Sequence, residues 1–437
     1  MKTTSAFGTI VLLFVILFDF VLTEKLSAQL YVEGGNTRHR FAQMYIGAEG
    51  FYQPGWNGVT KRVGEDGAME IVQMGDRIAP RLTIGGTHFW GHADFYVAFN
   101  VLPQSSTVQG LQHGFQLGVE TGARVYPWRI EKDALRPFVG LSWTSSTYSQ
   151  AVAGAGESGR GAIVRLDRAV LETGVAYQTG DIIWEAGAKW IPDNTTTYWI
   201  SRTDAASITL PNTAFRLGAK YVFDTTIGEE LREQEKPGYL ARREEVYREQ
   251  NRLNTWTVAA GPSSAVALQA SPHTLQNLPF ANPISAANRV ALDFGIGYFF
   301  YDLNAHLNVS YRPMTGSHAA FGVRQELNRH AVSLEAYKFF GDYQGFVPFV
   351  GATFGYESLQ YKETEGERVR VEEQAGKWLP GVIFGWDIRP TTTDAWLLRT
   401  NLRYTPGASL SVKGQEVIFP NFEFNFIQLI INLNRFF

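Results

Sequence analysis

The sequence predicts an all-β fold of two tandem antiparallel up-and-down barrels, each closed by eight strands that cross a membrane. Apolar and polar residues alternate in sixteen short runs, which is the period of a strand with two different faces. Long and short connections alternate between these runs, and the second eight runs repeat features of the first. After residue 28 no apolar run is long enough for a membrane helix, so any membrane spans must be strands of closed barrels.

The N-terminus predicts a secretory signal peptide over residues 1–28. Lys2 precedes an apolar run from Ile10 to Leu22, and Ser27 and Ala28 are the small residues expected before a cleavage site. The run is shorter than the ~20 residues of a spanning helix, so we favour cleavage after Ala28 over an N-terminal anchor. The chain contains no cysteine, which excludes a lipoprotein anchor, disulfide bonds and thiolate chemistry.

The composition favours a membrane barrel and disfavours nucleic-acid binding. The chain has 43 Gly, 11 Trp, 19 Tyr and 30 Phe, and its mean hydropathy is −0.14. Such values arise when apolar residues alternate with polar ones and aromatic residues gather at two membrane interfaces. A formal net charge of −3 provides no basic surface, so nucleic acid is not expected as a partner.

The first barrel repeat is predicted over residues 29–224. Its expected strands are Arg40–Tyr52, Ile78–Trp90, Asp94–Leu102, Phe115–Trp128, Arg136–Tyr148, Ile163–Tyr177, Ile182–Ile191 and Thr213–Phe223. Three long connections contain Gly58–Asp76, Ala151–Gly161 and Pro192–Asn212, whereas connections such as Gly91–Ala93 and Gln178–Asp181 are short. Membrane barrels show this alternation because their long loops and tight turns lie at opposite ends.

The second barrel repeat is predicted over residues 254–437. Its expected strands are Asn254–Leu268, Arg289–Phe300, Leu303–Arg312, Arg329–Phe340, Phe346–Tyr361, Lys377–Ile388, Ala395–Tyr404 and Phe422–Phe437. The sequence Pro-Phe-Val-Gly occurs at Pro137–Gly140 in the first repeat and at Pro348–Gly351 in the second, within strands of the same rank. We interpret the match as an internal duplication.

A charged linker is predicted between the repeats, over residues 225–253. It is dense in Glu, Arg, Lys and Gln, and Pro237-Gly238 interrupts two stretches of helical composition. A run of mixed charges is usually solvated, so we expect a helical segment without a binding role.

The last expected strand has one apolar face and one polar face. The apolar face carries Ile427, Leu429, Ile431 and Leu433, and the polar face carries Gln428, Asn432 and Asn434. One face can therefore meet lipid while the other meets a polar interior. A terminal strand that ends on phenylalanine resembles the assembly signal of bacterial outer-membrane proteins, here formed by Leu429, Ile431, Leu433 and Phe437.

Each repeat resembles the small outer-membrane barrels of the OmpA/OmpW-like type. The Pro-Phe-Val-Gly strand, the aromatic-terminated last strand and the small-residue interior carry the resemblance, which covers each half separately and together nearly all of the mature chain. It implies an up-and-down barrel without sheet edges in a Gram-negative outer membrane, with outer-membrane lipid and the barrel-assembly machinery as partners. Because each repeat has an even number of strands, both termini and the linker are expected on the periplasmic side.

The assembly signal leads to a first prediction. Replacing Phe437 with a polar residue should impair insertion, because the apolar end of the last strand would be lost. Heat-modifiable migration on gels and the yield in the outer-membrane fraction would measure the effect. Normal migration together with normal yield of the variant would count against the assembly signal.

Charged residues are expected to point into the barrels, because a charge on the lipid face costs about 2–4 kcal/mol near the midplane. In the first repeat we expect an interior charge network of Glu120, Arg124, Arg168, Glu172, Glu185, Lys189, Arg216 and Lys220. The same strand faces also carry Glu49, Arg81, Asp94 and Arg136. Two filled eight-stranded barrels would hold these groups as ion pairs, and a single sixteen-stranded barrel would line a watery pore with them.

The second repeat favours two filled barrels over one wide barrel. Its inward face is expected to include Phe299, Phe349, Leu379, Ile383, Leu397 and Ile430. A wide pore would expose these side chains to water, whereas a small barrel would bury them or use them to line a narrow apolar cavity.

No catalytic, cofactor or metal residues are predicted. His306 and Ser310 share a strand face but lie roughly 13 Å apart, too far for a serine and its base to pair. His88, His92 and His113 lie near turns or strand ends, with spacing that does not define a metal site.

Three functional classes remain open. The sequence favours a structural or surface-display protein with filled barrels, whose displayed loops would include Trp56–Asp76 and Asp193–Asn212. The alternative is a porin or transporter for small or apolar solutes, through one sixteen-stranded barrel or through the second repeat. An enzyme acting on lipids is the third class. No ligand can be named from the loops.

Overall fold

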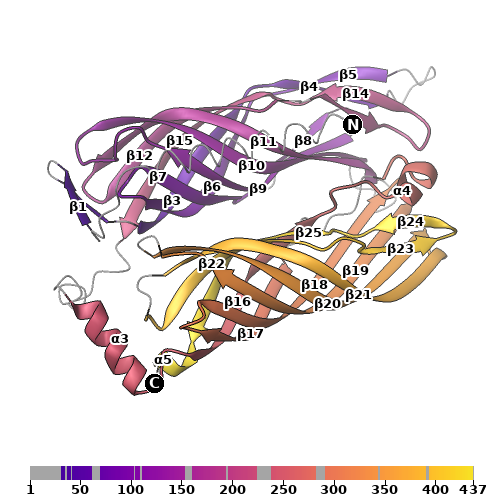
Figure 1. Ribbon diagram of the computed structural model, residues 1–437. Helices are drawn as coiled ribbons and strands as arrows, with labels where there is room; N and C mark the ends of the chain where they lie inside the picture. Colours follow the sequence, from indigo (N-terminus) through magenta and orange to yellow (C-terminus); the bar gives the residue numbers. More distant parts are fainter. Residues whose placement is uncertain are drawn as a thin grey trace.

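The chain forms two β-barrels that lie side by side in the computed structural model (Figure 1). The structure describes residues 31–34, 37–40, 42–61, 69–102, 104–108, 111–152, 160–192, 195–223, 238–281, 291–342, 345–389 and 393–436. The expected signal peptide, residues 225–237 of the linker and Phe437 lie outside these ranges. Among the described residues, no helix is both long and apolar enough to cross a membrane.

The first barrel is a closed ring of eight antiparallel strands. Its strands are β3 (Ala42–Gln53), β6 (Arg77–His88), β7 (Ala93–Asn100), β9 (Leu111–Val125), β10 (Leu135–Val152), β11 (Arg160–Thr179), β12 (Ile182–Trp190) and β15 (Thr213–Phe223). Neighbouring ring strands pair in chain order, and β15 returns to β3 with Gly218 opposite Glu49. The ring therefore closes within residues 42–223.

The second barrel is a separate closed ring. Its strands are β16 (Thr255–Val266), β17 (Ala291–Phe300), β18 (Ala305–Ala320), β19 (Val323–Phe339), β20 (Phe346–Glu365), β21 (Arg368–Ile388), β22 (Trp396–Tyr404) and β25 (Phe422–Asn432). β25 pairs with both β22 and β16, so the last strand meets the first. The prediction of two eight-stranded barrels is confirmed, and the alternative of a single sixteen-stranded barrel is wrong because each set of strands pairs with itself.

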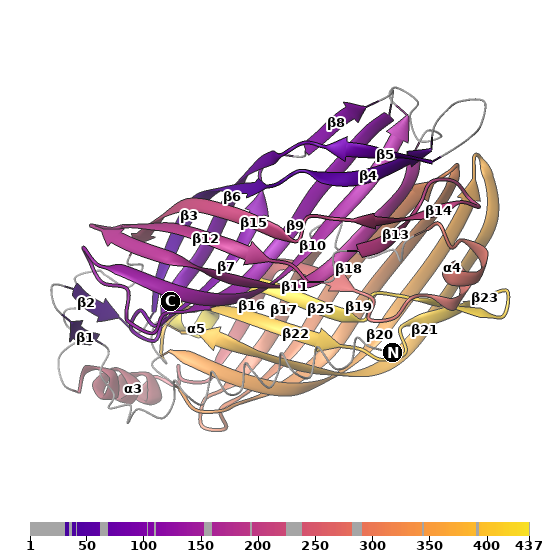
Figure 2. The same ribbon diagram turned by 90° about the horizontal axis from the view of Figure 1, so that it is seen from above.

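Each barrel has a turn end and a loop end, which we define by the connections. Tight connections such as Phe89–His92 and Tyr301–Asn304 lie at the turn end. At the loop end, inserted two-stranded sheets and a helix lengthen several connections: β4 (Trp56–Lys61) with β5 (Met69–Met74), β13 (Thr195–Trp199) with β14 (Ala205–Thr209), β23 (Ser409–Val412) with β24 (Gln415–Ile418), and α4 (Pro272–Asn277). Figure 2 shows α3 (Tyr239–Glu249) and α5 (Leu433–Phe436) at one end of the molecule, and α4 and β23 at the other.

Further short strands lie outside the two rings. β8 (Gln104–Val108) pairs with β9, and β1 (Tyr31–Gly34) pairs with β2 (Thr37–Arg40). Neither adds a member to a ring, so these strands leave the closure of the first barrel unchanged.

Four strands of the second barrel are longer than the sequence predicts. β18 and β19 continue past Arg312 to a tight turn at Phe321-Gly322, where both residues have positive φ. β20 and β21 likewise run to a turn at Gly366, whose φ is 57°. The extensions have polar residues on both faces, so the alternation that marks a strand in lipid is missing there and periodicity alone does not reveal them.

The last strand is shorter than predicted. β25 ends at Asn432, and Leu433–Phe436 form the short helix α5. Within β25, Leu429 is exposed on the outside while Gln428 and Asn432 are buried, so the predicted assignment of faces holds up to Asn432. Leu433 lies in the helix and not on the strand face.

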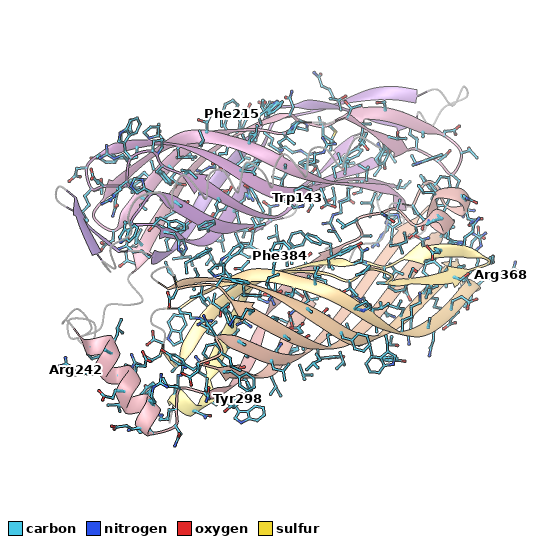
Figure 3. The ribbon with its side chains drawn as sticks, viewed as in Figure 1. Trp143, Phe215, Arg242, Tyr298, Arg368 and Phe384 are labelled. Carbon is cyan, nitrogen blue, oxygen red and sulfur yellow. The ribbon has the colours of Figure 1, made fainter. Side chains whose placement is uncertain are left out.

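The polarity of both barrels is the reverse of that of a water-soluble protein. Large apolar side chains cover the outside of each ring, among them Leu217 at 68% exposure and Ile296 at 62%. Figure 3 shows Phe215 and Tyr298 on the outer surface of the first and second barrel. Because the charges lie inside and the apolar residues outside, the outer surface suits a hydrocarbon environment.

The two barrels pack in parallel, with their turn ends side by side and their loop ends side by side. At the turn ends, Phe89, Trp90 and Ala93 form one apolar cluster with Phe346. At the loop ends, the Arg202 guanidinium pairs with Glu365 at 2.7 Å, and the Phe321 amide donates to the Arg160 carbonyl at 2.8 Å. A parallel arrangement allows both barrels to cross the same bilayer.

Candidate functional site: the barrel interiors

A network of buried ion pairs fills the middle of the first barrel. Five carboxylates face five basic side chains, each less than 10% exposed: Glu49, Asp94, Glu120, Glu172 and Glu185 with Arg81, Arg124, Lys189, Arg216 and Lys220. The ten charges of the network therefore cancel. A buried charge is tolerated only when it is paired, and this network meets that requirement with side chains from all the ring strands except β10.

Glu172 is the centre of this network. Its carboxylate accepts a hydrogen bond from Arg216, lies 3.2 Å from Arg124 Nε and 3.8 Å from Lys189 Nζ, and accepts from the Tyr96 hydroxyl at 3.2 Å. Its partners come from β7, β9, β12 and β15, so one carboxylate on β11 connects five of the eight ring strands.

Tyrosines and phenylalanines complete the interior packing. The Arg124 guanidinium lies 3.8 Å from the centre of the Tyr96 ring, and the Lys220 ammonium lies 4.4 Å from that of Tyr45. Tyr45 also donates a hydrogen bond to Asp94. These contacts fill the space between the charges, so the network is packed as well as neutral.

Seven of the eight predicted network residues lie together, and Arg168 is the exception. Arg168 is half-buried on the inner face of β11, four residues from Glu172 towards the loop end, and its Nη1 donates to the Pro192 carbonyl at 2.8 Å. It is bound to the loop that precedes β13 and is not in contact with Glu172. Arg136, also expected inside, is half-buried at the turn end and pairs with Glu131.

The second barrel contains a network of the same size. Its members are Asp293, Glu335, Glu357, Asp387 and Glu423 with Arg312, Arg329, Arg389, Arg399 and Arg403. Glu423 on β25 lies 2.8 Å from both Arg312 Nε and Arg329 Nη2, and thereby links the last strand to β18 and β19. Glu423 and Arg329 were not predicted as partners, although both fall on the polar face of their strands.

The second network divides into two layers along the barrel. The middle layer holds four carboxylates and three arginines, and its neighbour towards the turn end holds Asp387 between Arg389 and Arg399. Arg399 Nη1 lies 3.2 Å from Nδ1 of His306, whose Nε2 lies 2.8 Å from the Thr257 hydroxyl. Because arginine can only donate, Nδ1 must accept, and His306 is therefore neutral with its proton on Nε2.

Inserted hairpins close the loop ends of both barrels. Tyr198 and Ile208 of β13 and β14 are each 1% exposed and pack on inward-facing residues of the ring such as Tyr148. In the second barrel Val412 and Val417 of β23 and β24 pack in the same way on Leu359. The hairpins occupy the same place in each repeat, between the seventh and eighth ring strands, so both lumens have the same kind of plug.

The duplicated Pro-Phe-Val-Gly strand has the same packing in both barrels. Phe138 on β10 lies opposite Gly174 on β11, and Phe349 on β20 lies opposite Gly385 on β21. A Cβ at Gly174 would lie 2.5 Å from the Phe138 ring, and one at Gly385 would lie 2.9 Å from the Phe349 ring. Each phenylalanine ring therefore lies in the space that its glycine leaves open.

The histidines and serines considered from the sequence do not form a catalytic pair. Ser310 donates to Glu335 at 2.7 Å, whereas His306 contacts Thr257 and Arg399. His330 is on the outer face, where its Nδ1 lies 3.0 Å from the Tyr311 hydroxyl.

His92 and His113 of the first repeat have separate surroundings. His92 Nδ1 bonds to the Tyr126 carbonyl, and His113 bonds to the Tyr148 hydroxyl. The length of β9 separates them by roughly 40 Å. The described residues contain no group of three or more histidines and carboxylates placed to hold a metal ion.

Comparison with known proteins identified solved barrel structures of low similarity. No family model and no curated protein matches the chain. Neisserial surface protein A is 13% identical, with a TM-score of 0.24, over 42% of this chain and 99% of that one. The translocator domain of the autotransporter NalP from Neisseria meningitidis is 8% identical, with a TM-score of 0.17, over 99% and 98%. The CymD monoaromatic hydrocarbon channel is 10% identical, with a TM-score of 0.19, over 89% and 88%.

Proposed function

We propose that the protein is an integral outer-membrane protein whose two filled barrels anchor and display the hairpins of the loop end. The observation that carries this proposal is the separate closure of two small barrels around neutral, buried ion-pair networks. A barrel of eight strands has an interior just wide enough for side chains, and here side chains occupy it. In this arrangement the turn end, with the linker helix and α5, faces the periplasm, and the loop end faces the outside.

The hairpins at the loop end are the part of the molecule available for display. β18–β19 and β20–β21 extend the wall of the second barrel, and Figure 3 shows Arg368 at the tip of this extension. Arg202 of the first barrel joins the two loop ends through Glu365 and the Phe321 carbonyl. The loop ends thus form one continuous surface held by two rigid anchors.

Electrical conductance tests the filled barrels. The folded full-length protein, inserted in planar bilayers, should give few or no conductance steps, because plugs and ion pairs occupy both lumens. Heat-modifiable migration of the same sample would show that the protein is folded, and detergent without protein serves as the blank. Steady, large steps from the folded protein would favour the pore class and contradict the filled-barrel proposal.

A further inference from the structure

The β13–β14 hairpin, which closes the loop end of the first barrel, is bound to both barrels. Inside its own barrel, the Tyr198 hydroxyl donates to the Ala162 carbonyl at 2.9 Å, and the Tyr198 ring lies 4.9 Å from that of Tyr148. Trp199, the next residue on the strand, packs on a cluster of buried side chains of the second barrel. The members of this cluster are Leu278, Phe280, Ala281, Ala320 and Val323. The hairpin therefore connects the two barrels as well as filling the first.

The β18–β19 turn of the second barrel is the centre of this contact. The Phe321 ring packs on the second-barrel cluster, 5.7 Å from the Phe280 ring, and also on the buried cluster beneath the hairpin in the first barrel. The backbone of Phe321 is bound as well. Its amide donates to the Arg160 carbonyl at 2.8 Å, and its carbonyl accepts from Arg202 at 2.6 and 3.0 Å.

Phe321 has a backbone conformation that is unfavourable for a bulky residue. Its φ is 50°, in the left-handed region, where a Cβ is crowded by the backbone. Gly322 follows with a φ of 78°, and a glycine in place of Phe321 would form the same turn without strain. Because a glycine would lack the ring, we attribute the strained phenylalanine to the contacts that its ring makes with the first barrel.

A salt bridge holds the tip of the hairpin on the same turn. Arg202 lies in the connection between β13 and β14, and its Nη1 donates to the Glu365 carboxylate at 2.7 Å. Its Nε and Nη2 donate to the Phe321 carbonyl, so all three nitrogens of this side chain bind the second barrel. Glu365 precedes the β20–β21 turn, where the Gly366 amide donates to the Gly322 carbonyl at 3.1 Å. Two turns of the second barrel thus hold one arginine of the first.

The hairpin of the second barrel is held differently. Helix α4 of the same barrel binds the β23–β24 hairpin: the Ile418 amide donates to the Ser271 hydroxyl at 2.9 Å, and the Asn277 amide group donates to Gln415 at 2.6 Å. These bonds stay within one barrel. The hairpin of the first barrel is instead bound from outside, by its neighbour.

We propose that the Phe321-Gly322 turn is a clasp, with which the second barrel keeps the β13–β14 hairpin seated in the first. Loss of the clasp frees the hairpin and uncovers the inner wall around Tyr148 and Ala162. The ion-pair network of the first barrel stays in place, because none of its ten residues belongs to the hairpin. This inference goes beyond the anchoring role, since it concerns what holds the hairpin and not what the hairpin displays.

Labelling of a single buried thiol tests the clasp, because the chain has no cysteine of its own. Ala162 is 3% exposed beneath the hairpin, so a water-soluble maleimide should react slowly with an Ala162→Cys variant of the full-length protein in detergent. Adding Phe321→Gly should accelerate labelling roughly ten-fold or more, because the ring contacts are lost while the turn keeps its backbone. Adding Arg202→Gln should accelerate it by roughly two- to five-fold, the effect of an exposed salt bridge.

Two controls separate release of the hairpin from other effects. Glu372→Gln removes an exposed carboxylate of the same wall extension, which lies 3.7 Å from Lys362, and should leave labelling at position 162 unchanged. An Ala98→Cys reporter, at a fully buried position in the middle of the first barrel, should stay slow in every background.

Unchanged labelling at position 162 in the folded Phe321→Gly protein would overturn the proposal. Equal acceleration at positions 98 and 162 would also overturn it, since the whole barrel would then have loosened. If Phe321→Gly fails to show heat-modifiable migration, Arg202→Gln decides, because its side chain lies at the surface and its loss leaves both rings intact.

Discussion

Replacing Glu172 with leucine should destabilise the first barrel by about 3–5 kcal/mol, the usual cost of removing one partner from a buried ion pair. The substitution removes the carboxylate that contacts Arg124, Lys189 and Arg216 and leaves five buried cations with four carboxylates. Leucine fills a similar volume, so the loss arises mainly from charge. We expect a lower urea midpoint for the first barrel, followed by circular dichroism of the full-length protein in detergent.

Arg168→Leu is the matched control on the same strand face. Its guanidinium is half-buried, donates to the Pro192 carbonyl and makes none of the contacts of Glu172, so we expect a smaller loss of stability than for Glu172→Leu. The alternation of the strand predicts Arg168 and Glu172 in one network, and the structure separates them. Equal shifts of the urea midpoint for the two variants would show that the network does not stabilise the barrel as described.

Each half of the chain should fold alone into a compact, protease-resistant barrel when residues 29–223 and 253–437 are produced separately and refolded in detergent. The reason is the pairing of β15 with β3 and of β25 with β16, which leaves neither ring with a free edge. Heat-modifiable migration and resistance to trypsin would measure folding. The contacts between the barrels are small clusters at their ends, so their loss should not prevent closure.

The intact chain, cut at the linker after folding, provides the control for this experiment. Its two fragments should show the same migration as the separately refolded halves. If neither half folds alone while the intact chain does, the two barrels depend on each other for folding. If only the second half folds, the ion pairs of the first barrel need the neighbouring barrel for support.

The sixteen ring strands could be read from the sequence because lipid on one side and packed side chains on the other impose a period of two. The same period does not predict strand segments that extend beyond the lipid-facing part of the barrels. The β18–β19 extension beyond Arg312 has polar residues on both faces, and the strands of the hairpin β13–β14 have only five residues each, so a period of two does not distinguish either from a loop. The helical turn after Asn432 was missed because Leu433 continues the alternation of β25.

The inner charges were predictable as a set and their partners were not. Alternation assigns Glu120, Arg124 and Glu185 to the inner face without any knowledge of the fold. The partners of Arg124, however, come from β7, β11 and β12, and the angles and stagger of the closed ring decide which side chains meet. The same geometry puts Arg168 beside Pro192, and it brings Glu423 to Arg329 across residues that are 94 positions apart in the chain.

What the sequence by itself determined is therefore local. It determined the strands, their two faces, the repeat and the face on which charged residues must lie. Each of these follows from the contrast between hydrocarbon and a polar interior over a few residues. Whether sixteen strands close as one ring or two was decided by the tertiary structure, because hydrogen bonding between the last and first strand of each repeat is a long-range choice. The packing at the turn ends was decided there too: Tyr126 and Ile130 of the β9–β10 connection pack inside the first barrel, whereas Asp387 lies between Arg389 and Arg399 at the same end of the second.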